Sequence, residues 1–174
     1  MDTLKIIENP PEAYPAVSGL SAQAAELEAV AIWQRIEAYI AWRWVSRPVI
    51  LTVDGCGDWE PPLNPTTIDQ AYSCSGSDWT PVDLAFGPLG FMLPDGLTKI
   101  EATVGTDETP PAAVFEAFRR LAEYLADETD RAGLSQYSVK VGQIEESYSR
   151  SVSWVARAMQ HSGAGDLLRP YRRA

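Results

Sequence analysis

The feature that most constrains this chain is a long amphipathic stretch from Ser21 to Trp44. Its apolar residues recur at steps of three and four: Leu27, Val30, Trp33, Ile36 or Glu37, Ile40 and Trp44. This spacing predicts one continuous helix. Ser21 is suited to cap its first turn, and we expect Pro48 to end it. Aromatic side chains on several sides require more than one neighbour, which is either the core of the same chain or another subunit.

A second long helix is predicted from Thr109, as its cap, to about Arg131. Pro110 suits the first helical position, and Gly133 suits the residue beyond the end. An apolar stripe follows the helical period: Val114, Phe115, Phe118, Leu121, Ala122 and Leu125. We expect the two helices to pack on each other through these buried sides.

The segment between the helices has a different character. Val49–Val53 and Leu97–Val104 are β-branched and alternating, which predicts strands, and Ile68–Cys74 and Val82–Phe86 are candidates for shorter ones. Turn-rich stretches of glycine and proline separate them. The sequence therefore predicts a mostly α fold: a small helical bundle with a short β-strand insertion between the two long helices and an extended C-terminal tail.

Three regions are expected along the chain. Residues 1–20 contain three prolines and indicate an N-terminal arm. Residues 21–133 form the helical core, with the β insertion at about 48–105. Residues 134–174 form a C-terminal segment in which 152–160 favours a short helix, capped by Ser151 and followed by a partner-binding tail.

The charge is distributed unevenly. The chain carries a formal net charge of −10, yet the segment from Leu134 onward holds six basic and three acidic residues. An acidic body repels nucleic acid rather than gripping it. A basic end on an acidic body indicates either that the two parts meet different partners or that the end folds back onto its own body.

No catalytic constellation is apparent. His161 is the single histidine, and Cys56 and Cys74 lie outside any CxxC pair. Carboxylates near Cys56 favour a raised thiol pKa and disfavour a nucleophile. We expect no enzyme activity, cofactor or metal. The alternative is a small metal-dependent enzyme that uses Asp54, Asp58 and Glu60, although these residues lack the spacing of a calcium loop.

No apolar run is long enough for a membrane span, and no secretory signal is visible at the N-terminus. These features predict a cytosolic protein without a membrane partner.

Three passages in order resemble one family. They are RIEAYIAWRWVSRPVILTV, then IEATVGTDETPPAAVFEAFRRLAEYLADETDR, then SVKVGQIEESY followed by GAGDLLRPYRRA. Their order is similar to that of the head–tail connector (adaptor) proteins of long-tailed phages and of gene transfer agents. The resemblance runs from about Ser21 to the end, and it is poorest in residues 1–19 and in the tryptophan-rich middle.

The resemblance implies a structural protein that forms a dodecameric ring beneath a portal protein and extends the channel through which DNA passes. It also implies a stopper or tail-completion protein as a partner, and a location first in the cytoplasm and then in the neck of the particle. The portal-binding residues would be Leu167, Leu168, Arg169, Pro170, Tyr171, Arg172 and Arg173.

Contacts between neighbouring subunits need apolar side chains, for which Trp42, Trp44 and Trp154 are the candidates. Two alternatives to the portal-binding ring remain open. The terminal segment is either a partner-binding tail or a frayed end, and the whole chain is either a virion component or an interaction module outside any particle.

Overall fold

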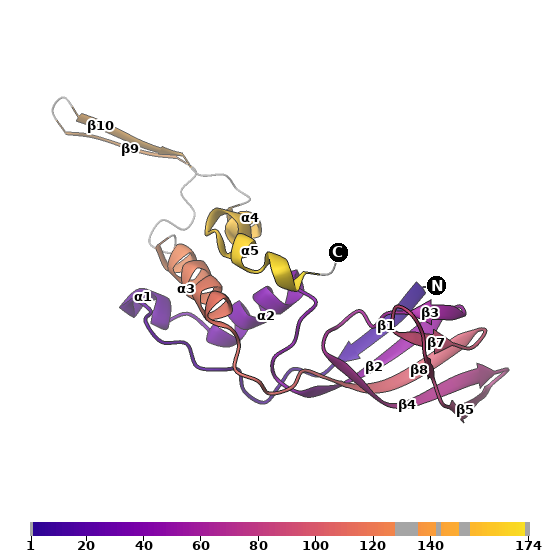
Figure 1. Ribbon diagram of the computed structural model, residues 1–174. Coiled ribbons are helices and arrows are strands. Elements are labelled where there is room, and N and C mark those ends of the chain that lie inside the picture. Colours follow the sequence, from indigo (N-terminus) through magenta and orange to yellow (C-terminus); the bar gives the residue numbers. More distant parts are fainter. Residues whose placement is uncertain (1, 128–135, 142–143, 150–153, 173–174) are drawn as a thin grey trace. The chain divides into compact units, whose positions relative to one another are not determined.

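The computed structural model of the protein describes residues 2–127, 136–141, 144–149 and 154–172. The chain divides into two compact units (Figure 1). The β unit is built from Met1–Tyr14 and Ala41–Thr109, and the helical unit from Pro15–Ile40 and Pro110–Arg172. Each unit therefore combines segments that are distant in sequence.

A five-stranded antiparallel sheet forms the larger part of the β unit (Figure 1). Its strands lie in the order β1-β2-β8-β4-β5, so the strand nearest the N-terminus is at one edge. Their bounds are Asp2–Glu8 for β1, Arg47–Asp54 for β2, Leu97–Val104 for β8, Thr66–Ser75 for β4 and Asp78–Val82 for β5.

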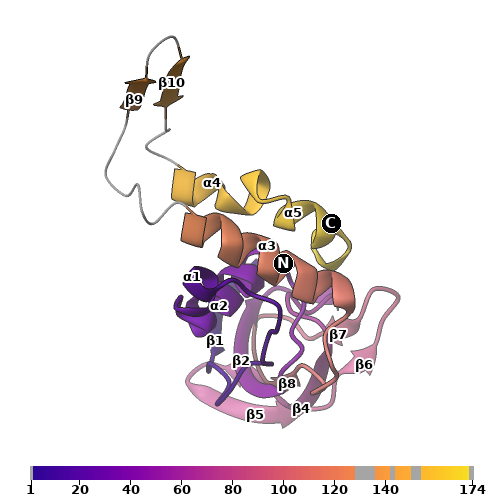
Figure 2. The same cartoon turned by 90° about the vertical axis from the view of Figure 1, so that its left-hand side faces the viewer.

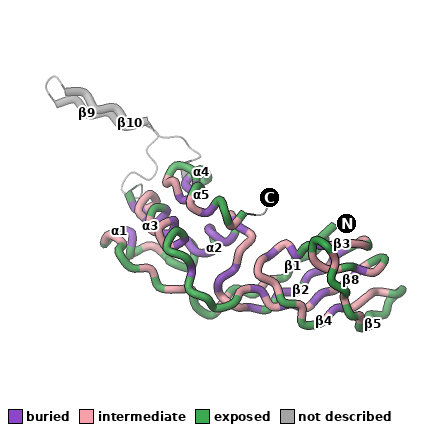
Figure 3. The backbone as a smooth tube through the Cα atoms, viewed as in Figure 1, coloured by how far each residue is buried: buried purple, intermediate pink, exposed green. Residues whose placement is uncertain are grey.

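A second, three-stranded sheet has the order β3-β7-β6, of which β6 and β7 are labelled in Figure 2. It consists of β3 (Gly57–Trp59), β7 (Phe91–Leu93) and β6 (Ala85–Phe86). Alternate residues of β2 and β8 are buried, as a sheet with one face on a core requires (Figure 3). The core cluster takes residues from both sheets: Val49, Leu51, Val53, Trp59, Leu63, Ala71, Leu93, Ile100, Ala102 and Val104.

The helical unit contains α1 (Ala22–Ala25), α2 (Ala29–Tyr39), α3 (Ala112–Asp127), α4 (Trp154–His161), α5 (Ala164–Leu167) and the 3₁₀ helix η2 (Arg169–Tyr171). Trp33 of α2 is buried, with its ring centroid 5.1 Å from that of Phe118 and 6.3 Å from that of Phe115 on α3. Its indole N–H donates to the carbonyl oxygen of Pro15. This aromatic cluster joins the two long helices.

Ser21 ties the start of α1 to α3. Its hydroxyl accepts from the backbone N–H of Ala24, which confirms the predicted cap. The Ser21 backbone N–H and hydroxyl each donate to a carboxylate oxygen of Glu123 at 2.7 Å. The backbone hydrogen bond, followed by the hydroxyl one, lowers the pKa of Glu123.

A further antiparallel hairpin pairs β9 (Gln136–Val141) with β10 (Ile144–Ser149). These two strands were not predicted from the sequence. The available signal was the alternation of Tyr137, Val139 and Val141, which is typical of a strand, but the segment as a whole is serine-rich and only weakly periodic.

The expectation of a mostly α fold is wrong. Strand residues outnumber helical residues in the described part of the chain, and the strands form antiparallel sheets with their own core. The expected β insertion at about 48–105 contains seven strands, and residues 2–8 of the expected arm add β1 to the sheet. Strand β5 (DWTPV) is exposed along most of its length and contains a proline, so it lacks the half-buried alternation by which strands are recognised.

The expectation of one continuous helix from Ser21 to Trp44 is also wrong. Glu28 adopts an extended conformation between α1 and α2. The second break, at Ile40, comes well before Pro48, because the following backbone pairs with Asn64 instead. The Asn64 N–H donates to the carbonyl of Ala41, and the Arg43 N–H donates to the carbonyl of Asn64. Pro48 lies within β2.

Other predicted elements are confirmed. Strands occupy Val49–Val53 and Leu97–Val104, and α3 buries Val114, Phe118, Leu121 and Ala122 as the second stripe predicts. The predicted end of this second helix, 128–131, lies outside the described residues. The extended C-terminal tail is not observed over Ala164–Tyr171, where α5 and η2 form.

An ion cluster fastens the end of β1 to the start of β2. The carboxylate of Glu8 accepts from Arg43 Nε at 2.6 Å and from Arg47 Nη2 at 2.6 Å, and both arginines are buried. Burial acts to raise the pKa of the Glu8 carboxyl. The hydrogen bonds and charges of Arg43 and then Arg47 outweigh it, and hold the pKa below its ordinary value of 4.5.

We predict that Glu8→Ala destabilises the chain by about 3 kcal/mol, because it leaves two buried guanidinium groups without this counter-charge. Urea unfolding at neutral pH measures the loss. Glu12→Ala is the matched control, since Glu12 is exposed on the same N-terminal segment.

The pH dependence of the stability follows from the lowered pKa of the Glu8 carboxyl. The stabilisation from Glu8 is complete above its ordinary pKa of 4.5 and is lost as the pH falls through the lower folded-state value. Glu8→Gln should therefore flatten this part of the stability curve. If the free energy of unfolding of Glu8→Gln fell at acidic pH as steeply as that of the wild type, the stabilising role of the Glu8 carboxylate would be contradicted.

Candidate functional site

Residues 163–172 form a compact turn, so this part of the C-terminal segment is not frayed. Gly163 adopts a left-handed conformation, with φ of 73°, and ends α4 before α5 begins. The Leu168 N–H then donates to the carbonyl of Ala164, and the Tyr171 N–H donates to that of Leu168. These bonds bring Arg169 and Pro170 into one tight turn at the end of the helical unit.

Tyr39, at the end of α2, holds this turn in place. A Cβ atom on Gly165 would lie 3.0 Å from the Tyr39 hydroxyl, so the two elements approach closely there. The guanidinium carbon of Arg172 lies 4.8 Å from the centre of the Tyr39 ring, and Arg172 Nη1 is 3.4 Å from the hydroxyl oxygen. Tyr39 is one of the aromatic residues of the predicted long helix, and nothing in its spacing indicated this role.

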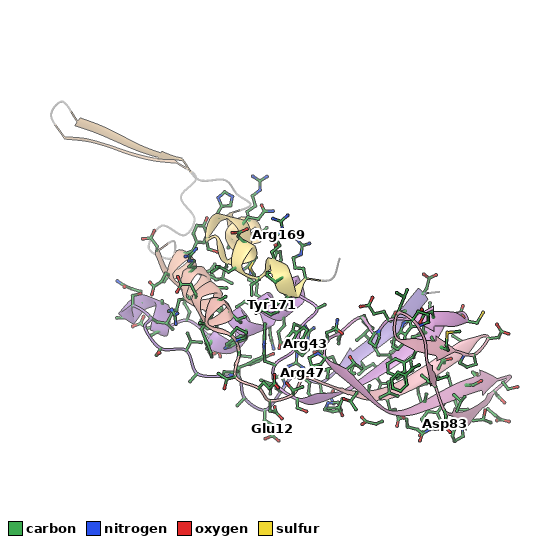
Figure 4. All side chains as sticks on the ribbon, in the orientation of Figure 1. Glu12, Arg43, Arg47, Asp83, Arg169 and Tyr171 are labelled. Atoms are coloured by element: carbon green, nitrogen blue, oxygen red, sulfur yellow. The ribbon has the colours of Figure 1, made fainter. Side chains whose placement is uncertain are left out.

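The residues predicted to bind a portal differ in exposure. Leu168 is 0% exposed and belongs to the core, whereas Leu167 and Tyr171 are half-buried. Arg169, Pro170 and Arg172 are exposed. Figure 4 shows Arg169 and Tyr171 on the C-terminal helices. Arg173 lies outside the described residues. Within this set, Leu168 anchors the turn, and the exposed residues present a basic surface.

The tryptophans predicted at a subunit interface also differ. Trp44 is 5% exposed, and its carbonyl accepts from the Asp107 N–H at 2.8 Å. Trp42 is half-buried and forms an isolated bridge with Asn64. The side chain of Trp154 lies outside the described part of the structure. A contact between subunits at these positions stays a prediction, with Trp42 offering more surface than Trp44.

The residues considered for metal chemistry are not brought together. Within the described ranges, no group of three or more histidine, cysteine, aspartate or glutamate residues is arranged to hold a metal ion. Asp58 instead accepts the backbone N–H of Leu89 at 2.9 Å. No described helix combines the length and apolar character that crossing a membrane requires.

Cys56 is exposed and forms no disulfide. A hydrogen bond to Asp95 and the charge of that carboxylate raise the thiol pKa, as the sequence led us to expect for a cysteine among carboxylates. His161 is exposed and stacks against Tyr124 at the end of α4, with ring centroids 6.3 Å apart. Neither side chain is placed as an activated nucleophile or base.

Comparisons with known proteins identify relatives in fold. No protein-family model and no curated protein matches the chain. A chain from the virion of a native gene transfer agent (GTA) particle shares 20% sequence identity, covers 84% of this chain and 75% of its own, and gives a TM-score of 0.51. A chain from the neck of an empty GTA particle shares 19% identity over 91% of this chain and 95% of its own, with a TM-score of 0.44. The first likeness shows a common fold.

We predict that Leu168→Ala lowers the free energy of unfolding by about 3 kcal/mol, because it opens a cavity in the helical unit. Leu167→Ala is the matched control and should cost less than about 1 kcal/mol, since Leu167 is only half-buried. Chemical denaturation followed by circular dichroism measures both. Equal losses would show that Leu168 does not anchor the turn.

Proposed function

We propose that the chain is a structural head–tail connector (adaptor) subunit of a gene transfer agent or phage-like particle. In this role, copies assemble into a ring beneath the portal, and the ring extends the DNA channel and joins the head to a stopper or tail-completion protein. The observation that carries the proposal is the fold shared with a chain of a GTA virion over 84% of this chain. The order of the three sequence passages supports it independently.

The charge of the chain is compatible with a conduit for DNA. Each lysine or arginine that grips a phosphate adds affinity, and hence drag on a moving duplex. The stretch from Pro48 to Thr98 contains seven acidic residues and no lysine, arginine or histidine. Arg43 and Arg47, which precede it, are buried against Glu8. A channel lined by such a surface would repel DNA rather than hold it.

The C-terminal turn is the proposed portal contact. Its exposed residues Arg169, Pro170 and Arg172 combine charge with a fixed backbone, which lowers the entropy lost on binding. Leu168 acts from the core by holding the turn in shape. We therefore assign direct contact to the exposed residues and a positioning role to Leu168.

We predict that Arg169→Glu weakens binding to purified portal protein by about tenfold or more, because a site that binds these arginines must carry negative charge, which the new carboxylate would repel. Arg157→Glu, an exposed arginine on α4, is the matched control and should bind as the wild type does. Surface plasmon resonance at two salt concentrations measures the affinities, and higher salt should narrow the difference.

A deletion of residues 169–174 tests the same contact without removing the buried Leu168. Circular dichroism should show a folded chain, while portal capture should be lost. Undiminished capture by this deletion would contradict the assignment of the C-terminal segment. Electron microscopy of particles containing a tagged chain tests its place in a ring below the portal.

A further inference from the structure

The turn between β6 and β7 presents apolar side chains to solvent. Phe86 is 87% exposed and Leu89 is 69% exposed, and Met92 on β7 is also exposed. Figure 2 shows β6 and β7 as a short hairpin of the β unit. These apolar side chains contribute little to the core of the β unit, so packing within the unit does not explain why they are apolar. Large exposed apolar groups gathered on one turn are typical of a surface that binds a partner.

The turn is held in shape by contacts to the rest of the β unit. The Gly87 N–H donates to the carbonyl of Gly90 at 2.9 Å, and the Leu89 N–H donates to a carboxylate oxygen of Asp58 at 2.9 Å. A Cβ atom at Gly90 would lie 2.5 Å from the carbonyl oxygen of Trp59, so only glycine fits there. The backbone that presents Leu89 is therefore fixed before any partner arrives.

Phe86 is positioned in the same way. Its ring contacts that of Phe91 in a tilted arrangement with centroids 5.2 Å apart, and Phe91 in turn packs against the core of the β unit. An aromatic side chain already held in its binding conformation loses little entropy on docking. Such residues commonly supply most of the energy of a protein interface.

The surroundings of the turn indicate the chemistry of the partner. Asp83 precedes β6 and Asp95 follows β7, and both are exposed. The pairing of Ala85 with Met92 places these two carboxylates toward the base of the hairpin, behind its apolar tip. No basic residue lies between Pro48 and Thr98 in the sequence, so β6, β7 and the turn that joins them carry no positive charge of their own.

An acidic rim of this kind opposes nucleic acid and anionic lipid surfaces. It also opposes the equivalent acidic face of a second copy of the chain. It complements an apolar hollow bordered by lysine or arginine on a different protein.

We propose that the Phe86–Leu89 turn docks into such a basic-rimmed apolar hollow on another protein of the particle. That the partner belongs to the particle rests on the proposed function. The chemistry of the contact does not, because it follows from the exposed side chains and the acidic rim.

The test replaces Leu89 with the photo-crosslinking residue p-benzoylphenylalanine in the full chain, in cells that produce the particle. The matched control places the same residue at Ser77, which is exposed in the β4–β5 turn of the same unit. We expect position 89 to crosslink to one other protein about tenfold more than position 77 does. Mass spectrometry should locate the attachment in an apolar segment flanked by lysine or arginine.

Variants then test how the apolar tip, Phe86 and Leu89, and the acidic rim, Asp83 and Asp95, contribute to binding. Phe86→Ser with Leu89→Ser should reduce association with the identified protein by about tenfold or more, and Asp83→Lys should also weaken it. Trp79→Ser is the control, since Trp79 is an exposed aromatic elsewhere in the β unit. Thermal unfolding should be unchanged in the tip variants, which separates loss of binding from loss of fold.

Three results would overturn the proposal: equal crosslinking at positions 77 and 89, attachment only to another copy of the chain, or attachment to an acidic surface. Absence of the chain from purified particles would instead overturn the proposed function. Crosslinks mapped in unfractionated cells would then show by the same criteria whether the Phe86–Leu89 turn docks onto another protein.

Discussion

The packing of Trp33 against Phe118 is the contact on which the helical unit depends. It joins α2 to α3, which the Ala41–Thr109 part of the β unit separates in the sequence. The Trp33 indole N–H also donates to the Pro15 carbonyl and so fixes the segment that leads into α1. The C-terminal turn requires this framework, because Tyr39 at the end of α2 supplies the surface against which Gly165 and Arg172 pack. The candidate binding surface is thus a product of the core rather than an independent tail.

The local pattern of apolar and polar residues was sufficient to predict an element that is both periodic and half-buried. The alternation of β2 and β8 and the stripe of α3 were predicted correctly, because one face of each element meets a core and the other does not. This pattern failed where the structure of a segment depends on hydrogen bonds to backbone that is distant in the sequence. Propensity favours helix through Ile40, yet the chain turns away because Ala41 and Arg43 pair with Asn64, and no local signal identifies that partner.

The candidate surfaces were predictable to different degrees. The basic, proline-containing end of the chain could be recognised from composition, whereas its division into a buried anchor at Leu168 and exposed contacts at Arg169 required the fold. The turn bearing Leu89 resembled many glycine- and proline-rich loops in the sequence. What distinguishes it is a tertiary hydrogen bond that the Leu89 backbone N–H donates to Asp58, a residue that the sequence suggested only as a possible cation ligand.

The interleaving of the two units has an evolutionary consequence. Neither unit is encoded by one continuous stretch, since the chain passes between them after Tyr14, Ile40 and Thr109. A single recombination event within the gene therefore cannot exchange one unit for a homologous version without cutting the other. The two units should descend together and diverge as a pair, while variation by insertion is confined to hairpin tips where neither hydrophobic core is interrupted.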